Sequence, residues 1–311
     1  MNPLKAPPED DAPVMRPDDP TTPTMNVLVL GATGMLGHVV YRALSAAVGL
    51  HVRGTVRSQS LVRFPIQTRP RLEIVDNLED GERLEHLFEQ VRPNVVINCA
   101  SVRKPAPADP MRSMAVLALL PQRLSHLCRR HGARLVQIGS DAVFAGSRGD
   151  YTEEDLPDAN DTYGMAKLLG EVREPHAITL RTSIIGHELL GQGGLLEWFL
   201  AQTGPCRCYT RAIFSGFPTV VLARVIRDVI LPRPDLHGVY HLATQPISKL
   251  ELLRLVAQRY GKTTEIIADD SVAIDRSLNA AKFAAATGYA PPAWPELVDA
   301  MYADHLESMR E

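Results

Sequence analysis

The stretch NVLVLGATGMLG, residues 26–37, carries the signal that decides the fold. Its first five residues form an apolar run that suits a strand buried on both faces, and a helical pattern follows. Gly31 permits a tight turn, Gly34 lets the backbone approach a pyrophosphate, and Gly37 lets helix and strand pack closely. The alternative is an ordinary strand-to-helix loop with incidental glycines. We expect a phosphate-binding turn at the helix N-terminus, formed by Gly31, Thr33, Gly34, Met35, Leu36 and Gly37.

The bulk composition excludes several classes of protein. The 311 residues are 45% hydrophobic and 22% charged, which is typical of a globular chain with one large domain or one domain and an appendage. A net charge of −3 without Lys/Arg-rich blocks gives a nucleic-acid partner no support. No apolar run approaches the ~20 residues of a membrane span. Cys206 and Cys208 lack a nearby Cys/His pair, so the sequence predicts no metal site, and its four cysteines fit a reducing cytoplasm.

Strands and helices alternate over most of the chain. Residues 1–24 are rich in Pro, Asp and Thr and nearly devoid of large apolar side chains, so we expect a disordered tail. The alternation that follows predicts an α/β fold, a Rossmann-type doubly wound parallel sheet. We expect a cofactor-binding domain over residues 25–185 and a smaller α/β substrate-binding region over 186–311, with about 212–243 returning to the first domain.

Individual elements can also be predicted. A largely apolar helix is expected from about residue 111 to 131, interrupted at Pro121. After residue 186 the pattern loosens. There we expect a short strand over 212–216 and helices over 249–260 and 294–308.

The end of the second strand indicates the choice of cofactor. Residues 51–57 read as that strand, and an acid at its end would bond the ribose hydroxyls and repel a 2′-phosphate. The chain instead offers Arg57 and Ser58 with no acid, which favours NADP(H). Alternatively, Arg57 is a solvated loop residue.

Two later strand ends supply further candidate contacts to the cofactor. The third strand, residues 72–75, ends in Asp76 and Asn77, which suit a polar contact to an adenine edge. The fourth ends in small residues where the cofactor backbone would pass, namely Cys99, Ala100 and Ser101.

Tyr163 and Lys167 are four residues apart on a predicted helix, so their side chains share one face. A nearby ammonium favours the phenolate, so the pair predicts a proton donor that works near neutral pH. The alternative is a half-exposed aromatic beside a solvated lysine. Ser140 follows the fifth strand, at the sheet edge where ligands of open α/β folds bind, although its hydroxyl could merely bond the strand-end backbone.

The glycine turn, Ser140 and the Tyr163-to-Lys167 spacing together resemble the extended short-chain dehydrogenase/reductase superfamily, over about residues 25–311. Within it the chain is most similar to dTDP-4-dehydrorhamnose reductases and related reductases of nucleotide-linked 4-keto-6-deoxy sugars. The resemblance implies NADPH-dependent reduction of a sugar 4-keto group. Ser140 would then bond the ketone oxygen, Tyr163 would donate the proton, and Lys167 would also hold the nicotinamide ribose.

The chain departs from the family pattern at three positions. Leu117 stands where relatives carry an Asn of a proton relay, Ala142 where they often carry Tyr, and Ile184 where an aromatic is frequent. The substrate pocket is expected to form from residues 186–218 and 275–279. The substrate contacts are predicted to be Ser140, Asp141, Ala142, Arg211 and Arg276, of which the two arginines could instead be structural ion-pair partners.

Two other functions stay open on the sequence. The first is a sugar-nucleotide epimerase or dehydratase on the same fold, although Asp141 and Ala142 supply only half of the acid/base pair that a dehydratase needs. The second is a non-catalytic NADP-binding regulator, because eukaryotic methionine adenosyltransferase has a regulatory subunit that resembles the same reductases. The expected partner is a nucleotide-linked sugar, with no nucleic acid and no membrane, and a homodimer is possible.

Overall fold

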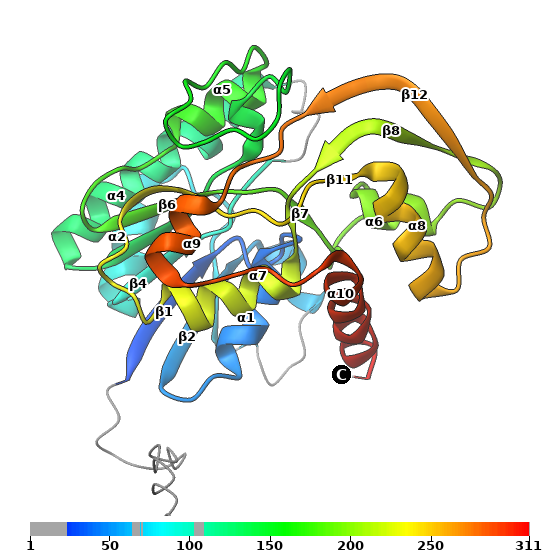
Figure 1. Ribbon diagram of the computed structural model, residues 1–311. Coiled ribbons are helices and arrows are strands. Elements are labelled where there is room, and N and C mark those ends of the chain that lie inside the picture. The colour runs from blue at the N-terminus through cyan, green and yellow to red at the C-terminus, as the bar shows by residue number, and fades with distance from the viewer. Residues whose placement is uncertain (1–23, 64–68, 70, 103–108, 311) are drawn as a thin grey trace, which may run out of the picture.

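The structure is a computed structural model that describes residues 24–63, 69, 71–102 and 109–310. The expected tail therefore lies outside the described residues except for Thr24. Figure 1 shows a broad sheet flanked by helices, with an arch of two long strands, β8 (Cys206–Phe214) and β12 (Ile266–Asp275), at one side.

Seven of the described strands form one parallel sheet in the order β10-β6-β5-β4-β1-β2-β3. From the N-terminus these are β1 (Met25–Leu30), β2 (Leu50–Val56), β3 (Leu72–Ile74), β4 (Val95–Asn98), β5 (Arg134–Ile138), β6 (Ala177–Arg181) and β10 (Gly238–His241). The chain runs outward from β1 through β2 to β3, then returns to β4 on the other side of β1. This reversal between β1 and β4 confirms the predicted doubly wound fold, in which ligands bind at the carboxyl ends of the strands.

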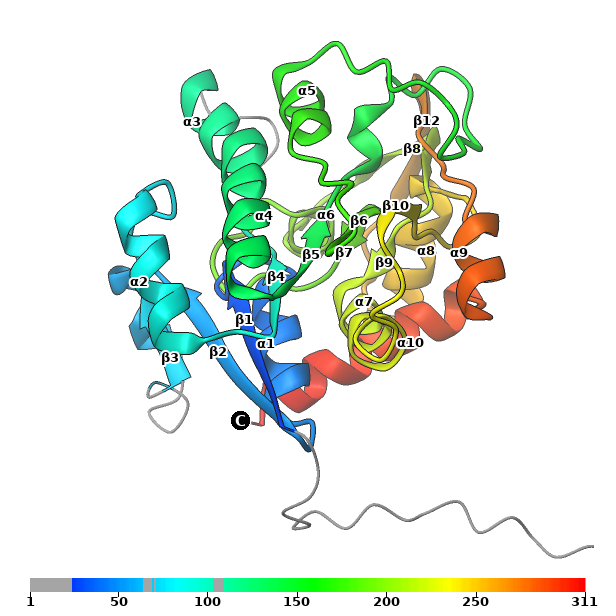
Figure 2. The same cartoon turned by 90° about the vertical axis from the view of Figure 1, so that its left-hand side faces the viewer.

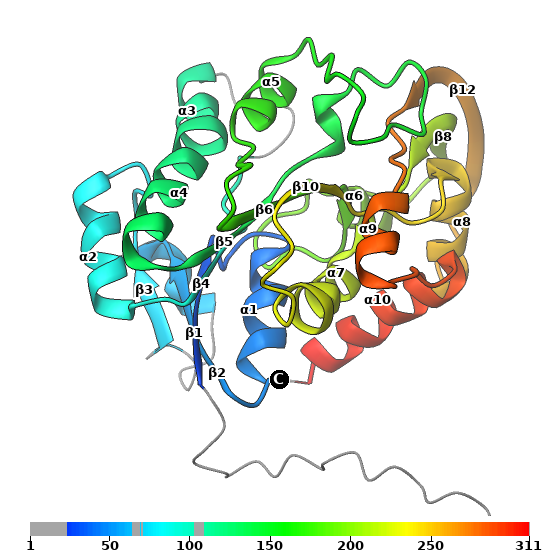
Figure 3. The same ribbon diagram turned by 60° about the vertical axis from the view of Figure 1, so that its left-hand side comes forward.

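Helices cover both faces of the sheet. Figures 2 and 3 show α2 (Gly81–Val91) and α4 (Leu120–His131) on one face, and α1 (Gly37–Ser45), α7 (Thr219–Val225) and α10 (Trp294–Ser308) on the other. The alternating residues of β1 divide between two cores. Val27 and Val29 pack toward α1 and α7, whereas Leu28 and Leu30 pack toward α2 and α4. A strand buried on both faces explains the continuous apolar run of β1.

The expected helix over residues 111–131 is three consecutive segments. They are α3 (Pro110–Met114), a π-helical turn η3 (Ala115–Leu119), and α4. The prediction placed the interruption at Pro121, but Pro121 lies in the first turn of α4, where its missing N–H is tolerated. The irregular π-helical turn comes before Pro121, around Leu117. In a regular helix the ring of Pro121 would clash with the carbonyl of Leu117, four residues earlier. That carbonyl faces Gly170, where a Cβ would clash with it.

The part of the chain after β6 builds a second, smaller sheet in the order β11-β8-β12, with β11 at Ile247–Ser248. The expected short strand over 212–216 was wrong in extent, because β8 begins at Cys206. β12 was not predicted at all. It is largely exposed and contains small and acidic residues, so it shows no clear apolar alternation.

Two of the later helices match the prediction, and several short elements complete this part of the chain. α8 (Lys249–Tyr260) and α10 have the predicted bounds, and Ser248 and Glu251 form a capping box at the start of α8. β7 (Ile184–Ile185) pairs with β9 (Phe217–Pro218). α6 (Leu195–Leu200), the π-helical η5 (Ile226–Ile230) and α9 (Ala281–Thr287) complete this part. The division of the chain at residue 185 stays a prediction.

Two features of the described residues concern membrane spans and disulfides. No helix among them is long and apolar enough to cross a membrane. Cys99, Cys128, Cys206 and Cys208 are all buried and form no disulfide.

Substitution of Gly37 should test the close approach of α1 to the first turn. A Cβ on Gly37 would clash with the backbone carbonyl of Gly31, which cannot move as a side chain can. We expect Gly37→Ala to lower the free energy of unfolding in urea by about 2 kcal/mol or more, the scale of an overpacked core.

The matched control is Gly81→Ala. Gly81 is the first residue of α2 as Gly37 is of α1, but a Cβ at Gly81 would meet nothing within 4 Å. This variant should be as stable as the unmutated protein or slightly more so. Equal stability of both variants would contradict the proposed close approach.

Candidate active site

The first turn leaves the N-terminus of α1 open to a ligand. Gly31 has φ +75°, and its N–H donates to Thr55 Oγ1 (3.0 Å), so the turn is held against β2. Leu36, the N-cap of α1, makes no side-chain hydrogen bond to the helix. The N–H of His38 already donates to the carbonyl of Gly34 (3.1 Å), so an anion at this helix N-terminus would have to bind the neighbouring amides.

Gly34 has a different role from its two neighbours in the motif. A Cβ on Gly31 would lie 2.9 Å from the Ala100 backbone, and Gly37 is crowded by Gly31, so the protein itself requires both glycines. A Cβ on Gly34 would come no closer than 3.3 Å to any protein atom. Contacts within the protein therefore give less reason for a glycine at position 34 than the close approach of a ligand does. The turn fits a dinucleotide pyrophosphate. Thr33 and Met35 flank Gly34 and are half-buried.

Arg57 follows β2 and is exposed. No hydrogen bond or ion pair ties its guanidinium to another residue within the described ranges. Beside it, the Asp76 carboxylate accepts from the Ser58 N–H (2.7 Å) and hydroxyl (2.8 Å), and these bonds lower the pKa of Asp76. Asn77 Oδ1 likewise accepts from the N–H of Glu79 (2.8 Å). Asp76 thus holds the segment after β2, where the nearby Arg57 cation also lowers its pKa, and Asn77 holds its own turn.

The end of β4 lies against the phosphate turn. Cys99 is buried, and burial raises the pKa of its thiol to about 12, so it is inert. The Ala100 backbone packs on Gly31, as described above. Ser101 follows and is exposed. The contact of Ala100 with Gly31 therefore sets Ser101 next to the expected pyrophosphate site.

Tyr163 lies in α5 (Thr162–Leu169), and the hydroxyls of Ser101 and Ser140 lie near enough to its phenol to lower its pKa. The helix begins here because Asp161 caps it, accepting from the N–H of Gly164 (2.6 Å). Burial, followed by the Asp141 carboxylate, raises the pKa of Tyr163 above its ordinary value, although the two serine hydroxyls lower it. The structure thus brings together one phenol and two hydroxyls at the carboxyl edge of the sheet.

The expected effect of Lys167 on Tyr163 is not found. Lys167 is 5% exposed, and its Nζ donates to the carbonyl of Ile138 (3.1 Å). Burial lowers the pKa of Lys167 to about 8, so the ammonium is still mostly charged at pH 7. Lys167 is not among the groups that shift the pKa of Tyr163 here, so its predicted effect on the phenol stays a prediction. The phenol keeps its proton because it is buried near a carboxylate.

Ser140 combines the two roles that the sequence left open. Its Oγ accepts from the N–H of Ala142 (3.1 Å) and so caps the short η4 helix (Asp141–Val143). The same hydroxyl donates to Asp141 Oδ1 (3.3 Å) and lowers the pKa of the nearby Tyr163. Ser140 is thus a turn-forming residue that also lies near the candidate acid.

The three departures from the family pattern have different surroundings. Leu117 is 1% exposed and lies in a small apolar cluster with Ala166 and Tyr163. Ala142 is also buried. Ile184 begins β7 and pairs with Phe217 of β9.

The two predicted substrate arginines lie on β8 and directly after β12, and their contacts to a substrate stay predictions. Arg276 Nε donates to the carbonyl of Phe144 (2.7 Å), which fastens the chain after β12 to the segment that follows Ser140. The neighbouring Asp275 N–H donates to the carbonyl of Gly146 (2.8 Å). Arg276 is thus held as a structural residue, and Arg211 is exposed on β8.

Sequence reasoning missed a buried polar cluster beneath this site. Arg181 at the end of β6 is fully buried and donates to both carboxylate oxygens of Glu171 (2.6 and 3.0 Å). Its Nη1 lies 3.1 Å from His241 Nε2, and His241 Nδ1 lies 2.9 Å from the carbonyl of Tyr151. Nδ1 therefore carries the proton and Nε2 accepts from Arg181. One signal in the sequence could have revealed this cluster. Arg181 ends a buried strand, and a buried charge needs a partner.

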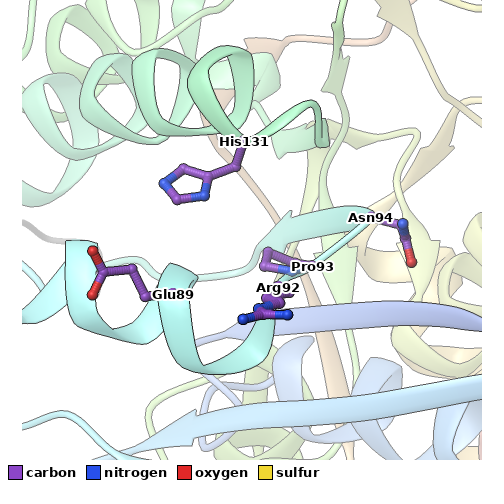
Figure 4. Close-up of a pocket in the computed structure, with 5 residues that line it drawn as sticks. All are labelled: Glu89, Arg92, Pro93, Asn94 and His131. Carbon is purple, nitrogen blue, oxygen red and sulfur yellow. The ribbon is translucent and has the colours of Figure 1, made fainter.

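Two cavities are lined by residues other than Tyr163. One, of about 390 Å³, is lined by Glu89, Arg92, Pro93, Asn94 and His131 (Figure 4). It borders the start of β4, at the amino edge of the sheet, opposite to Ser140. The other, of about 410 Å³, lies on the small sheet and is lined partly by Ile213, Arg254 and Asp275.

The sequence profile of the RmlD substrate binding domain matches residues 25–306. The chain belongs to this family. This result confirms the resemblance to dTDP-4-dehydrorhamnose reductases that the motifs indicated.

The chain is similar both to a methionine adenosyltransferase subunit and to a dTDP-4-dehydrorhamnose reductase. Rat methionine adenosyltransferase 2 subunit beta is 34% identical over 265 residues, which cover 76% of this chain and 73% of the rat protein. The dTDP-4-dehydrorhamnose reductase of Streptomyces griseus is also 34% identical, but over 150 residues, 46% of this chain and 43% of that enzyme.

Solved structures show the same fold. A dTDP-4-dehydrorhamnose reductase from Bacillus anthracis in complex with NADP has a TM-score of 0.74 at 19% identity, covering 90% of this chain and 99% of that one. A hypothetical dTDP-4-dehydrorhamnose reductase from Sulfolobus tokodaii has a TM-score of 0.72 at 24% identity, covering 89% and 99%.

The buried cluster predicts how the stability of this RmlD-family chain depends on pH. Burial, followed by the Arg181 cation, lowers the pKa of His241 from 6.5 to about 4. Between these values the unfolded chain binds a proton that the folded chain does not, so stability falls as the pH falls. We expect this one group to remove about 2 kcal/mol of unfolding free energy between pH 7 and pH 5.

Urea unfolding at the two pH values measures this effect. His241→Gln should lose that part of the pH dependence, whereas His51→Gln, at an exposed position, should keep it. A pH dependence that is the same in His241→Gln and the unmutated protein would contradict the assignment.

Proposed function

We propose that the protein reduces the 4-keto group of a nucleotide-linked 6-deoxy sugar with NADPH. The observation that carries this proposal is the position of the Tyr163 phenol, which lies near the hydroxyls of Ser140 and Ser101 at the carboxyl edge of the sheet. The phosphate turn lies beside it through the contact of Gly31 with Ala100. A dehydrogenase of this fold needs these two parts to be adjacent.

The residues present fit NADP(H). The N-terminus of α1 and the close backbone approach that Gly34 permits would hold the pyrophosphate, and Arg57 would pair with the 2′-phosphate. Lys167 would lie under the nicotinamide ribose. The bound cofactor would supply the hydride. The four buried thiols favour a reducing compartment, so we place the protein in the cytoplasm.

The chain's own groups account for the proton chemistry. Reduction builds negative charge on the ketone oxygen, and hydrogen bonds that strengthen with this charge lower the barrier. The Ser140 hydroxyl would give one such bond. Tyr163 would give the other and then its proton. Its raised pKa keeps the phenol protonated at neutral pH, as a donor requires.

A non-catalytic regulator of methionine adenosyltransferase is the second candidate. Its support is the similarity to the rat beta subunit over three quarters of the chain. A regulator would still bind NADPH, because the phosphate turn does not depend on Tyr163. The discriminating experiment is NADPH oxidation by the purified protein with a 4-keto-6-deoxy sugar nucleotide, beside activation of a methionine adenosyltransferase catalytic subunit.

Tyr163→Phe tests the proton donor. The ring remains, so stability and NADPH affinity should hold, while kcat should fall by at least ~10²-fold, the scale of a lost positioned acid. Lys167→Met should weaken NADPH binding as well as turnover. Tyr240→Phe, at a half-buried tyrosine of β10, is the control and should leave kcat unchanged. Near-normal turnover in Tyr163→Phe would remove the catalytic assignment.

Arg57→Asp tests the choice of cofactor. The unmutated protein should bind NADPH more tightly than NADH, and the acid should reverse or flatten that preference, because it would repel the 2′-phosphate. Fluorescence titration with both cofactors measures the ratio. Arg224→Asp makes the same charge change at an exposed position of α7 and should leave the ratio as it was. Equal affinities in the unmutated protein would contradict this assignment.

A further inference from the structure

The carbonyl of Gly34, in the middle of the phosphate turn, is held by hydrogen bonds from one residue. The backbone N–H of His38 donates to this oxygen over 3.1 Å, and the imidazole Nδ1 of His38 lies 2.8 Å from the same oxygen. Because a carbonyl can only accept, Nδ1 is the ring nitrogen that carries the proton. His38 therefore clamps Gly34 both through its backbone and through its side chain.

This clamp fixes the direction of the next amide. A trans peptide is planar, so its C=O and N–H point in opposite directions. The Gly34 carbonyl points along α1 toward His38, and the Met35 N–H of the same peptide therefore points out of the helix N-terminus. Within the described part of the chain, no protein group accepts from the Met35 N–H. It is an amide that an anion at this turn would meet.

The side chain of His38 is suited to this contact and to no other that the turn requires. It is half-buried, and burial lowers the pKa of its imidazole, so the ring is neutral above pH 7. A neutral imidazole has a single N–H, and here the Gly34 carbonyl takes it. An aliphatic side chain would fill the same space but would leave the carbonyl with the backbone bond alone.

We propose that His38 is a positioning residue for the cofactor pyrophosphate, which rests on the NADP(H) site of the proposed function. Its imidazole holds the peptide between Gly34 and Met35 so that the Met35 N–H donates to a phosphate oxygen. The two ends of this peptide reinforce each other, because an N–H that donates to an anion makes its own carbonyl a stronger acceptor. His38 thus acts on the ligand through the turn, and no proton is transferred.

The first test reads the imidazole directly and needs neither substrate nor cofactor. In protein labelled with ¹⁵N-histidine at pH 8, the His38 ring resonances are assigned by their loss in His38→Asn. Long-range ¹H–¹⁵N spectra should then show a protonated Nδ1 and an unprotonated Nε2. A His38 ring with its proton on Nε2 could not donate to Gly34 and would overturn the proposal.

The second test measures the Kd of NADPH by fluorescence titration, on variants whose folding is checked by urea unfolding. His38→Leu has no donor, so its Kd should rise by about fivefold to tenfold, the scale of one lost hydrogen bond. His38→Asn places an amide nitrogen where Nδ1 was and should recover most of the affinity. His86→Leu makes the same change at an exposed position of α2 and should leave Kd unchanged. Equal losses in His38→Leu and His38→Asn would contradict the clamp.

Adenosine 2′-phosphate distinguishes positioning from general damage to the site, because it has no pyrophosphate. Its Ki for displacing NADPH should stay within about twofold in His38→Leu, whereas Arg57→Asp should weaken both ligands. A His38→Leu protein that binds both ligands less well by the same factor overturns the positioning role.

The outcomes also distinguish this inference from the function on which it rests. If the unmutated protein binds NADPH and His38→Leu binds it equally well, the clamp is overturned and the cofactor assignment stands. An unmutated protein that does not bind NADPH overturns the cofactor assignment, and the role of His38 with it.

Discussion

The ion pair between Arg181 and Glu171 is the constraint on which the site depends. Two hydrogen bonds of 2.6 and 3.0 Å join the groups, and both side chains are almost completely buried. His241 accepts a further bond from Arg181, and the guanidinium lies 5.2 Å from the centre of the Phe144 ring. Removing one partner of such a pair costs about 3–5 kcal/mol, because the other charge stays buried. Glu171 directly follows α5, so the pair fixes that helix to the end of β6.

This anchor sets how Tyr163 meets Ser140. The turn after β5 is held to β6 by the Asp141 N–H, which donates to the carbonyl of Thr182 (3.2 Å). α5 then approaches this turn closely at Gly164, where a Cβ would clash with the carbonyl of Ala142. The phenol and the serine hydroxyl therefore belong to two elements that are both fastened to the same strand. Their contact does not rely on a mobile loop.

The parts of the fold that could be predicted from the sequence are those that local chemistry decides. The first turn follows from its glycines, and the start of α8 follows from the Ser248–Glu251 capping box. β12 could not be recognised, because an exposed edge strand is specified by its partner β8 rather than by its own apolar pattern. Likewise, spacing alone placed Tyr163 and Lys167 on one face, but burial and the acceptor at Ile138 decide where the charge goes. The pKa of a buried group is a property of the fold and not of the motif.

Cofactor binding by itself does not separate an enzyme from a regulator on this fold. The phosphate turn joins β1 to α1 and is held by Thr55 and Ala100, and Arg57 directly follows β2. The informative feature is the phenol itself. Burying a hydroxyl costs free energy unless it is hydrogen-bonded, and Tyr163 lies near two serine hydroxyls and beside a carboxylate that opposes its ionisation. A structural residue at this position would be served as well by a phenyl ring, which needs no partners. An arrangement that holds a protonated phenol at the sheet edge, next to a phosphate-binding turn, therefore favours proton donation over packing.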